Sequence, residues 1–162
     1  MSRCEAILEK LGKQLPHVPK PVAVYIPAIA TGDLVFTSGQ LPLKQGKLSH
    51  EGIVGRDLTK EQAKEAAEVA TLNALAAVKS LILDLDQVRQ IVKVNVFVAS
   101  APDFTAQPFV ANGASELLEK LFGERGRHAR AAIGAASLPL NAPVEVELVV
   151  NFSPKAPQYF GS

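Results

Sequence analysis

Three charged side chains near the C-terminus have types and a spacing that could carry chemistry. Arg130 stands among small apolar residues in HARAAIGAAS, and Glu145 and Glu147 follow in VEVELVV. An arginine flanked by alanine has room beside it for a ligand, and its planar guanidinium suits bidentate recognition of a carboxylate. A nearby glutamate could act on water or on a proton. These residues predict a site for a small carboxylate, provided that the fold brings them together.

The segments that carry these charges have the pattern of two strands joined by a turn that contains Leu-Pro. Side chains alternate across a sheet, so VEVELVV places its four alternate apolar residues toward a core and its glutamates on the opposite face. If the two strands pair, Arg130 lies near Glu145 or Glu147. A cross-strand ion pair on a solvated face would explain the same charges, since such pairs are common and contribute little.

The composition is that of one ordinary globular domain. The chain has 162 residues, of which 48% are apolar and 20% are charged, so we expect a single domain over residues 1–162. The formal net charge is +1, and no basic run is interleaved with aromatic residues. Nucleic-acid binding is therefore disfavoured.

Cysteine and histidine are too sparse and scattered to predict a disulfide or a metal site. The single cysteine, Cys4, lies near an N-terminus that we expect to be loose, and no ligand spacing accompanies His17, His50 or His128. We interpret the histidines as surface or turn residues, with the alternative that His128, two residues from Arg130, reaches the same site. The apolar runs are too short to cross a membrane, and a reducing cytoplasm fits one free cysteine.

The element pattern predicts an α+β fold. A capping box, Thr59 to Gln62, opens a long helix rich in alanine. The expected elements are a helix over 4–15, strands before and within 34–43, a loop with a short hairpin arm over 44–57, a helix over 59–83, a strand over 87–100, a helical region to about 122 interrupted at Pro108 and Gly113, and two strands within 128–150. Apart from the first helix, the order is β-β-α-β-α-β-β.

Two helices can cover only one face of such a mixed sheet. We expect Arg130, Glu145 and part of the segment 38–40 on the other face, together with apolar residues that a monomer would leave bare. The sequence therefore predicts a homo-oligomer that packs sheet against sheet.

Three separated pieces of the chain carry a distinctive combination of motifs. They are VYIPAIATGDLVFTSGQLP, the capped alanine helix followed by VNVFVAS, and HARAAIGAASLPLNAPVEVE. In this combination they resemble the RidA family, also called the YjgF or endoribonuclease L-PSP family, from about residue 21 to residue 151. The N-terminal extension over 1–20 and a longer segment before Asn112 resemble a divergent, longer-chain branch.

The resemblance implies a chorismate-mutase-like fold, assembled as a homotrimer with small-molecule clefts between subunits. Family members studied as enzymes hydrolyse reactive enamines or imines, such as 2-aminoacrylate, to 2-oxo acids and ammonia. No cofactor is needed for such a reaction. We therefore expect a cofactor-independent hydrolase of the 2-iminobutanoate/2-iminopropanoate deaminase type, acting on a small carboxylate substrate.

The family's functional residues match individual positions here. Arg130 matches the arginine that holds the substrate carboxylate, and Glu145 matches the glutamate that positions or activates water. The remaining matched positions, which line the cleft in the family, are Tyr25, Ser38, Gly39 and Asn112. Each also has a plain structural interpretation, such as a half-buried aromatic for Tyr25 and a bulge for Gly39.

Two departures from the family pattern support a second hypothesis. Where many active members carry Cys and Glu beside the arginine, this chain has Ala132 and Gly134, which widens the cleft and removes a polar partner. This change favours a non-catalytic trimer that binds a small carboxylate metabolite. A third hypothesis is the ribonuclease or translation-inhibitor activity of some relatives, which the balanced charge disfavours.

Overall fold

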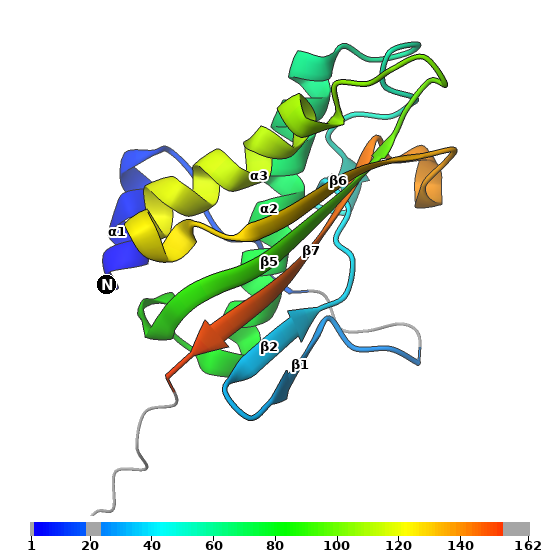
Figure 1. The fold of residues 1–162 in the computed structure, drawn as a ribbon. Coiled ribbons are helices and arrows are strands. Elements are labelled where there is room, and N and C mark those ends of the chain that lie inside the picture. Colours follow the sequence, from blue (N-terminus) through cyan, green and yellow to red (C-terminus); the bar gives the residue numbers. More distant parts are fainter. Residues whose placement is uncertain (1, 19–23, 154–162) are drawn as a thin grey trace, which may run out of the picture.

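The computed structural model describes residues 2–18 and 24–153. Within these residues, a five-stranded mixed sheet has the order β1-β2-β7-β5-β6 (Figure 1). Its strands are β1 (Ala28–Thr31), β2 (Leu34–Thr37), β5 (Val88–Ala99), β6 (Ala129–Ala135) and β7 (Val144–Phe152). A separate hairpin consists of β3 (Leu43–Lys44) and β4 (Lys47–Leu48).

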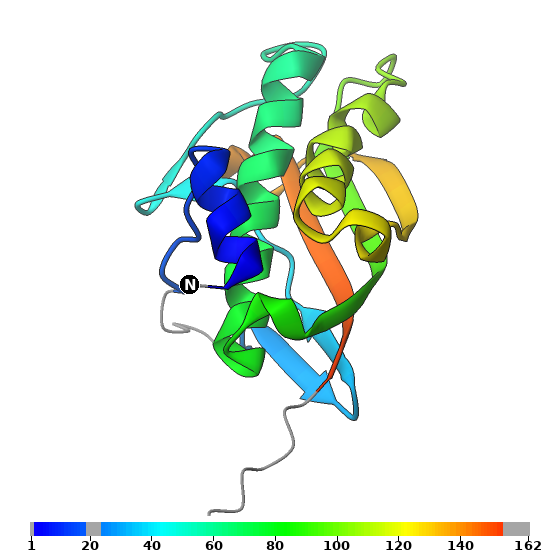
Figure 2. The same ribbon diagram turned by 90° about the vertical axis from the view of Figure 1, so that its left-hand side faces the viewer.

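Helices cover one face of this sheet. They are α1 (Arg3–Lys10), α2 (Lys60–Ile82) and α3 (Gln107–Phe122). Figure 2 shows α2 and α3 side by side, with α1 on their outer side. The predicted α+β fold, with a mixed sheet and helices on one face, is confirmed, as is the predicted order of its main elements.

The two long helices begin and pack as their sequences require. At the start of α2, Thr59 and Gln62 form both hydrogen bonds of the predicted capping box. The predicted interruption of α3 is wrong. Pro108 lies in the first helical turn, where it displaces no hydrogen bond, and Gly113 continues the helix. A Cβ at Gly113 would overlap the backbone carbonyl of Lys64, so this glycine permits close contact with α2.

Buried and exposed side chains alternate regularly only in the second half of β5. The pairing with β7 shifts register between Val88 and Gln90 and again between Ile91 and Lys93. These bulges turn Ile91 into the core and leave Val92 38% exposed. An alternating sequence pattern does not show where a bulge inserts an extra residue, so it cannot predict this change of face.

The N-terminus is not loose, contrary to expectation. Cys4 and Leu8 of α1 are buried in the core, and the carboxylate of Asp86 accepts hydrogen bonds from the backbone N–H groups of Arg3 and Cys4. Burial, strengthened by Asp86, raises the pKa of the Cys4 thiol to about 12. Cys4 is therefore a packing residue with an unreactive thiol.

The predicted pairing of the last two strands is wrong, and this changes the site. β6 pairs with β5 in parallel, and β5 pairs with β7 antiparallel, so β5 lies between them. The reason is α3, which crosses over from β5 and returns the chain parallel to it. Arg130 is paired with Val94, whose side chain is buried beneath the helices. Arg130 thus lies on the helix side of the sheet, as does Ala132, and not on the open face.

The open face of the sheet carries apolar side chains. Ile29, Phe36 and Ile133 are 57%, 40% and 48% exposed. Glu145 and Glu147 of β7 lie on this face, as predicted, because their neighbours Val144, Val146 and Leu148 are buried. No helix in the described part of the chain is long and apolar enough to cross a membrane.

Candidate functional site

The guanidinium of Arg130 is held by α3. Its Nη1 donates to Oδ1 of Asn112 at 2.8 Å and to Oγ of Ser115 at 3.1 Å. These two acceptors lie three residues apart and therefore share one helix face. Among the described residues, no carboxylate lies within ion-pair distance of Arg130. The other N–H groups of this exposed side chain are available to a carboxylate ligand.

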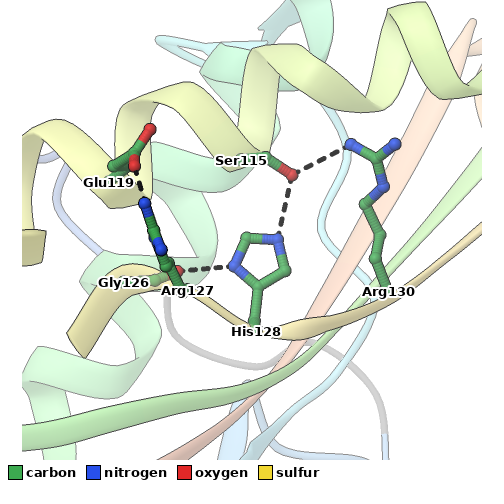
Figure 3. Close-up of a pocket in the computed structure, with 6 residues that line it drawn as sticks. All are labelled: Ser115, Glu119, Gly126, Arg127, His128 and Arg130. Atoms are coloured by element: carbon green, nitrogen blue, oxygen red, sulfur yellow. Dashed lines mark hydrogen bonds and ion pairs between the residues drawn. The ribbon is translucent and has the colours of Figure 1, made fainter. Parts of the chain in front are cut away.

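Ser115 also contacts His128, which precedes Arg130 on the same edge of the sheet (Figure 3). His128 Nδ1 lies 2.6 Å from the carbonyl oxygen of Gly126, which can only accept, so Nδ1 carries a proton. Nε2 then accepts from the Ser115 hydroxyl at 2.9 Å. Burial lowers the pKa of His128, and the charge of Arg130 lowers it further, against the opposing hydrogen bond to Gly126. His128 is therefore neutral at neutral pH.

These residues line an open pocket of about 400 Å³. Its lining residues are Ser115, Glu119, Gly126, Arg127, His128 and Arg130. Apart from the glycine, all of them present polar or charged side chains. The pocket is therefore suited to a small polar molecule that can place an anionic group on Arg130.

A second group of predicted residues lies around Glu145. A Cβ at Gly39 would overlap the Glu145 carboxylate, so only glycine lets the backbone approach this side chain. Beside it, Gln40 and Val146 exchange both backbone hydrogen bonds, at 2.8 and 2.9 Å. Ser38 Oγ donates to the carbonyl oxygen of Ile26 at 2.6 Å, which fastens the segment that carries Tyr25. Tyr25 itself is 63% exposed.

The electrostatic setting of Glu145 differs from that of its neighbour. Glu147 accepts a hydrogen bond from Nδ2 of Asn95 at 2.8 Å. Glu145 is half-buried, and this burial raises its pKa, with a further increase from the charge of Glu147. A carboxyl group with a raised pKa holds a proton more readily near neutral pH, which suits general acid–base chemistry.

The predicted residues thus form two groups on opposite faces of one sheet. Arg130 and Asn112 meet on the helix side. Glu145 lies with Ser38 and Gly39 on the other side, because Glu145 is paired with Phe97 whereas Arg130 is paired with Val94. Within one chain, the expected approach of Arg130 to the glutamates is therefore wrong.

Sequence reasoning missed Ser115. Its spacing from Asn112 could have identified it, because residues three apart share one helix face, and this face of α3 lies toward Arg130. The alternative that His128 reaches the same site as Arg130 is confirmed, since both residues line one pocket. The described residues contain no cluster of three His, Cys, Asp or Glu side chains that could hold a metal ion.

The space beside Gly134 is occupied, although a wider cleft was expected there. A Cβ at Gly134 would lie 3.0 Å from Nε2 of Gln107 and 3.1 Å from Oγ of Ser100. Gln107 Nε2 donates to the carbonyl of Phe104 at 2.8 Å, which fixes the amide in this place. Gly134 has no side chain, and the amide of Gln107, in the segment before Asn112, places a polar group beside it instead.

Comparison with known proteins connects this arrangement to one family. The sequence profile described as "YjgF/chorismate_mutase-like, putative endoribonuclease" matches residues 5–152. Protein TCP17 of Trypanosoma cruzi is 41% identical over 152 residues, which cover 93% of this chain and 95% of that protein. A 2-iminobutanoate/2-iminopropanoate deaminase of Dermatophagoides farinae is 30% identical over 135 residues, covering 83% and 91%. The crystal structure of Atu1372 from Agrobacterium tumefaciens, a protein of unknown function, has a TM-score of 0.87 and 46% identity and covers 93% of both chains. The profile match over nearly the whole chain and the extent of these similarities show that the chain belongs to the YjgF/RidA family, as its motifs indicated.

Proposed function

We propose that the protein hydrolyses reactive enamines and imines of the 2-aminoacrylate type to 2-oxo acids and ammonia, without a cofactor. The observation that carries this proposal is the guanidinium of Arg130. Asn112 and Ser115 hold it in place, and no carboxylate of the described residues neutralises it. Such a group can anchor the carboxylate of a 2-imino acid and leave the imine carbon open to water. The name of the Dermatophagoides relative gives this reaction class for that protein.

The second catalytic group in this proposal is Glu145 of a neighbouring copy. Arg130 and Glu145 of one chain lie on opposite faces of the sheet and cannot share a substrate. We therefore propose a homotrimer in which Glu145 of one copy completes the site around Arg130 of the next. Packing of copies on the open face would bury Ile29, Phe36 and Ile133, which a monomer exposes.

The roles of the remaining residues follow from this arrangement. Glu145 of the neighbouring copy orients the attacking water, and its raised pKa suits it to accept a proton later in the reaction. Gly39 leaves room for the Glu145 carboxylate, and Ser38 holds the segment that carries Tyr25 through its hydrogen bond to Ile26. Asn112 orients the arginine.

The cytoplasmic location stays a prediction from the cysteine content.

One observation favours a second candidate function. The anchor for a carboxylate is complete within one chain, whereas no catalytic carboxylate accompanies it there. A trimer that binds a carboxylate metabolite without turning it over would need only the Arg130 group. Ribonuclease activity is less favoured, since a formal net charge of +1 provides little attraction for phosphates.

The test is release of ammonia and 2-oxo acid from imines that an auxiliary enzyme generates in the assay. The proposal expects acceleration over the spontaneous rate by the wild type, its loss in Arg130→Ala, and its retention in Arg89→Ala, which removes an exposed arginine at the start of β5. Binding of pyruvate without any acceleration would support the metabolite-binding trimer. Neither acceleration nor pyruvate binding would refute both candidates.

A further inference from the structure

The Arg130 site contains a continuous chain of hydrogen bonds that ends on a titratable nitrogen. Arg130 Nη1 donates to Ser115 Oγ at 3.1 Å, and Ser115 Oγ lies 2.9 Å from His128 Nε2. The other ring nitrogen, Nδ1, is committed to the carbonyl of Gly126 at 2.6 Å. Figure 3 shows Ser115 of α3, Arg130 of β6 and His128, directly before β6, around one pocket.

The direction of this chain is determined by what each group can donate. A guanidinium has no lone pair to offer, so Ser115 Oγ must accept from Arg130. The serine proton is then free to point at Nε2 of His128. Donation from a cation to the hydroxyl oxygen also makes that hydroxyl a stronger donor. The ordered chain therefore presents a polarised hydroxyl to an unprotonated imidazole nitrogen.

The charged groups around His128 leave this nitrogen available as a base. Arg130 and Arg127 are the cations of the pocket, and Glu119 is its carboxylate. Glu119 is paired with Arg127 at 3.6 Å, and Arg127 also contacts Glu124 at 3.5 Å. Neither carboxylate contacts His128. The hydrogen bond to Gly126 favours the imidazolium, but burial and the charge of Arg130 outweigh it and lower the pKa of His128.

We propose that Ser115 and His128 form a proton relay for the substrate anchored on Arg130. This inference rests on the proposed deaminase function. It assigns the relay, and not Glu145, the transfer of a proton from water to the leaving nitrogen. Ser115 is the member that touches water or substrate, and His128 acts through it.

The relay accounts for each proton in the reaction. As the water oxygen bonds to the carbon of the protonated imine, one water proton passes to Ser115 Oγ while the serine proton passes to His128 Nε2. The relay then returns a proton to the nitrogen, the C–N bond breaks and ammonia leaves. The hydroxyl left on carbon becomes the carbonyl of the 2-oxo acid, and Glu145 of the neighbouring copy takes its proton and passes it to solvent.

The test compares kcat with KM for Ser115→Ala, His128→Gln and the double variant in the complete protein. The relay predicts that each single variant lowers kcat by about 10²-fold or more, with the double variant no worse than the singles, because the residues act as a unit. In His128→Gln, KM and pyruvate binding should change little, because both acceptors of Arg130 remain. Ser115→Ala also removes one of these acceptors and should therefore raise KM in addition to lowering kcat. In His128→Gly, added imidazole should restore part of kcat.

A matched control is available elsewhere in the chain. Ser49 and His50 form another serine–histidine contact, at 3.2 Å, outside the Arg130 pocket. Ser49→Ala and His50→Gln should leave kcat unchanged. If Ser115 and His128 only hold Arg130 in place, their variants would raise KM, keep kcat and fail to respond to imidazole. That result in an active wild type would overturn the relay alone, whereas an inactive wild type would overturn the relay and the deaminase function together.

Discussion

Arg130 and Glu145 lie on opposite faces of the same sheet, because one is paired with Val94 of β5 and the other with Phe97. Positions three apart on a strand point in opposite directions. The arginine therefore reaches up to Asn112 and Ser115 of α3, and the glutamate lies beside Gly39 on the open face. Within a single chain, the two side chains therefore cannot contact the same small molecule.

The geometry at Arg130 predicts that charge alone will not replace it. Arg130→Lys keeps the positive charge but loses the planar fork that can donate two parallel hydrogen bonds to a carboxylate. We expect pyruvate affinity to fall by about tenfold or more, since a charge-assisted hydrogen bond is worth roughly 1.5–3 kcal/mol. Titration calorimetry measures this change. An affinity equal to that of the wild type would contradict bidentate anchoring.

The raised pKa of Glu145 predicts an unusual dependence of stability on pH. A carboxyl group whose pKa is higher in the folded state than in the unfolded state binds more protons when folded, so stability falls as pH rises from the unfolded pKa through the folded one. Glu145→Gln should therefore raise Tm at neutral pH, and the gain should shrink as pH falls toward the ordinary range of glutamate. Thermal unfolding between pH 4 and 8 tests this.

The variant Glu147→Gln provides the matched comparison. It removes the neighbouring charge that contributes to the Glu145 shift and leaves the contribution of burial in place. Glu147→Gln should therefore also weaken the loss of stability with rising pH, but by less than Glu145→Gln does. A Glu145→Gln variant that loses stability at neutral pH would count against burial as the cause.

Close packing of the two long helices predicts that Gly113→Ala is destabilising. Intrinsic helix propensity alone would make this change stabilising by up to about 1 kcal/mol. Because the added Cβ would overlap the carbonyl of Lys64, we expect instead a loss of about 1–3 kcal/mol. Chemical denaturation gives the sign directly, and a gain in unfolding free energy would show that the helices can move apart without cost.

Local patterns predicted the parts of the fold that depend on neighbouring residues. The capping box of Thr59 and Gln62 located the start of α2, and the alternation in β7 located its core face. Long-range pairing was beyond such patterns. The segments of β6 and β7 are adjacent in sequence, yet β5 is inserted between them because α3 returns the chain parallel to β5.

Because long-range strand pairing could not be predicted, the arrangement of the candidate site could be predicted only in part. The residue types of Arg130 and Glu145 predicted carboxylate binding and action on water, and the match to the family predicted which other residues line the site. Their faces could not be predicted, because a face depends on which strand is the neighbour. Gly113 looked like a break, since the sequence does not show that a carbonyl of another helix lies against it.

The central claim is that Arg130 of one copy and Glu145 of another form a single site, and mixed oligomers test it most directly. Arg130→Ala and Glu145→Gln proteins should each be inactive as deaminases. After exchange of subunits between them, a cyclic trimer assembled at random from equal amounts contains intact sites at about a quarter of its interfaces. The account predicts that the mixture recovers about that fraction of wild-type turnover. Mixed trimers that form, as seen by native mass spectrometry, but stay at the background rate would contradict it.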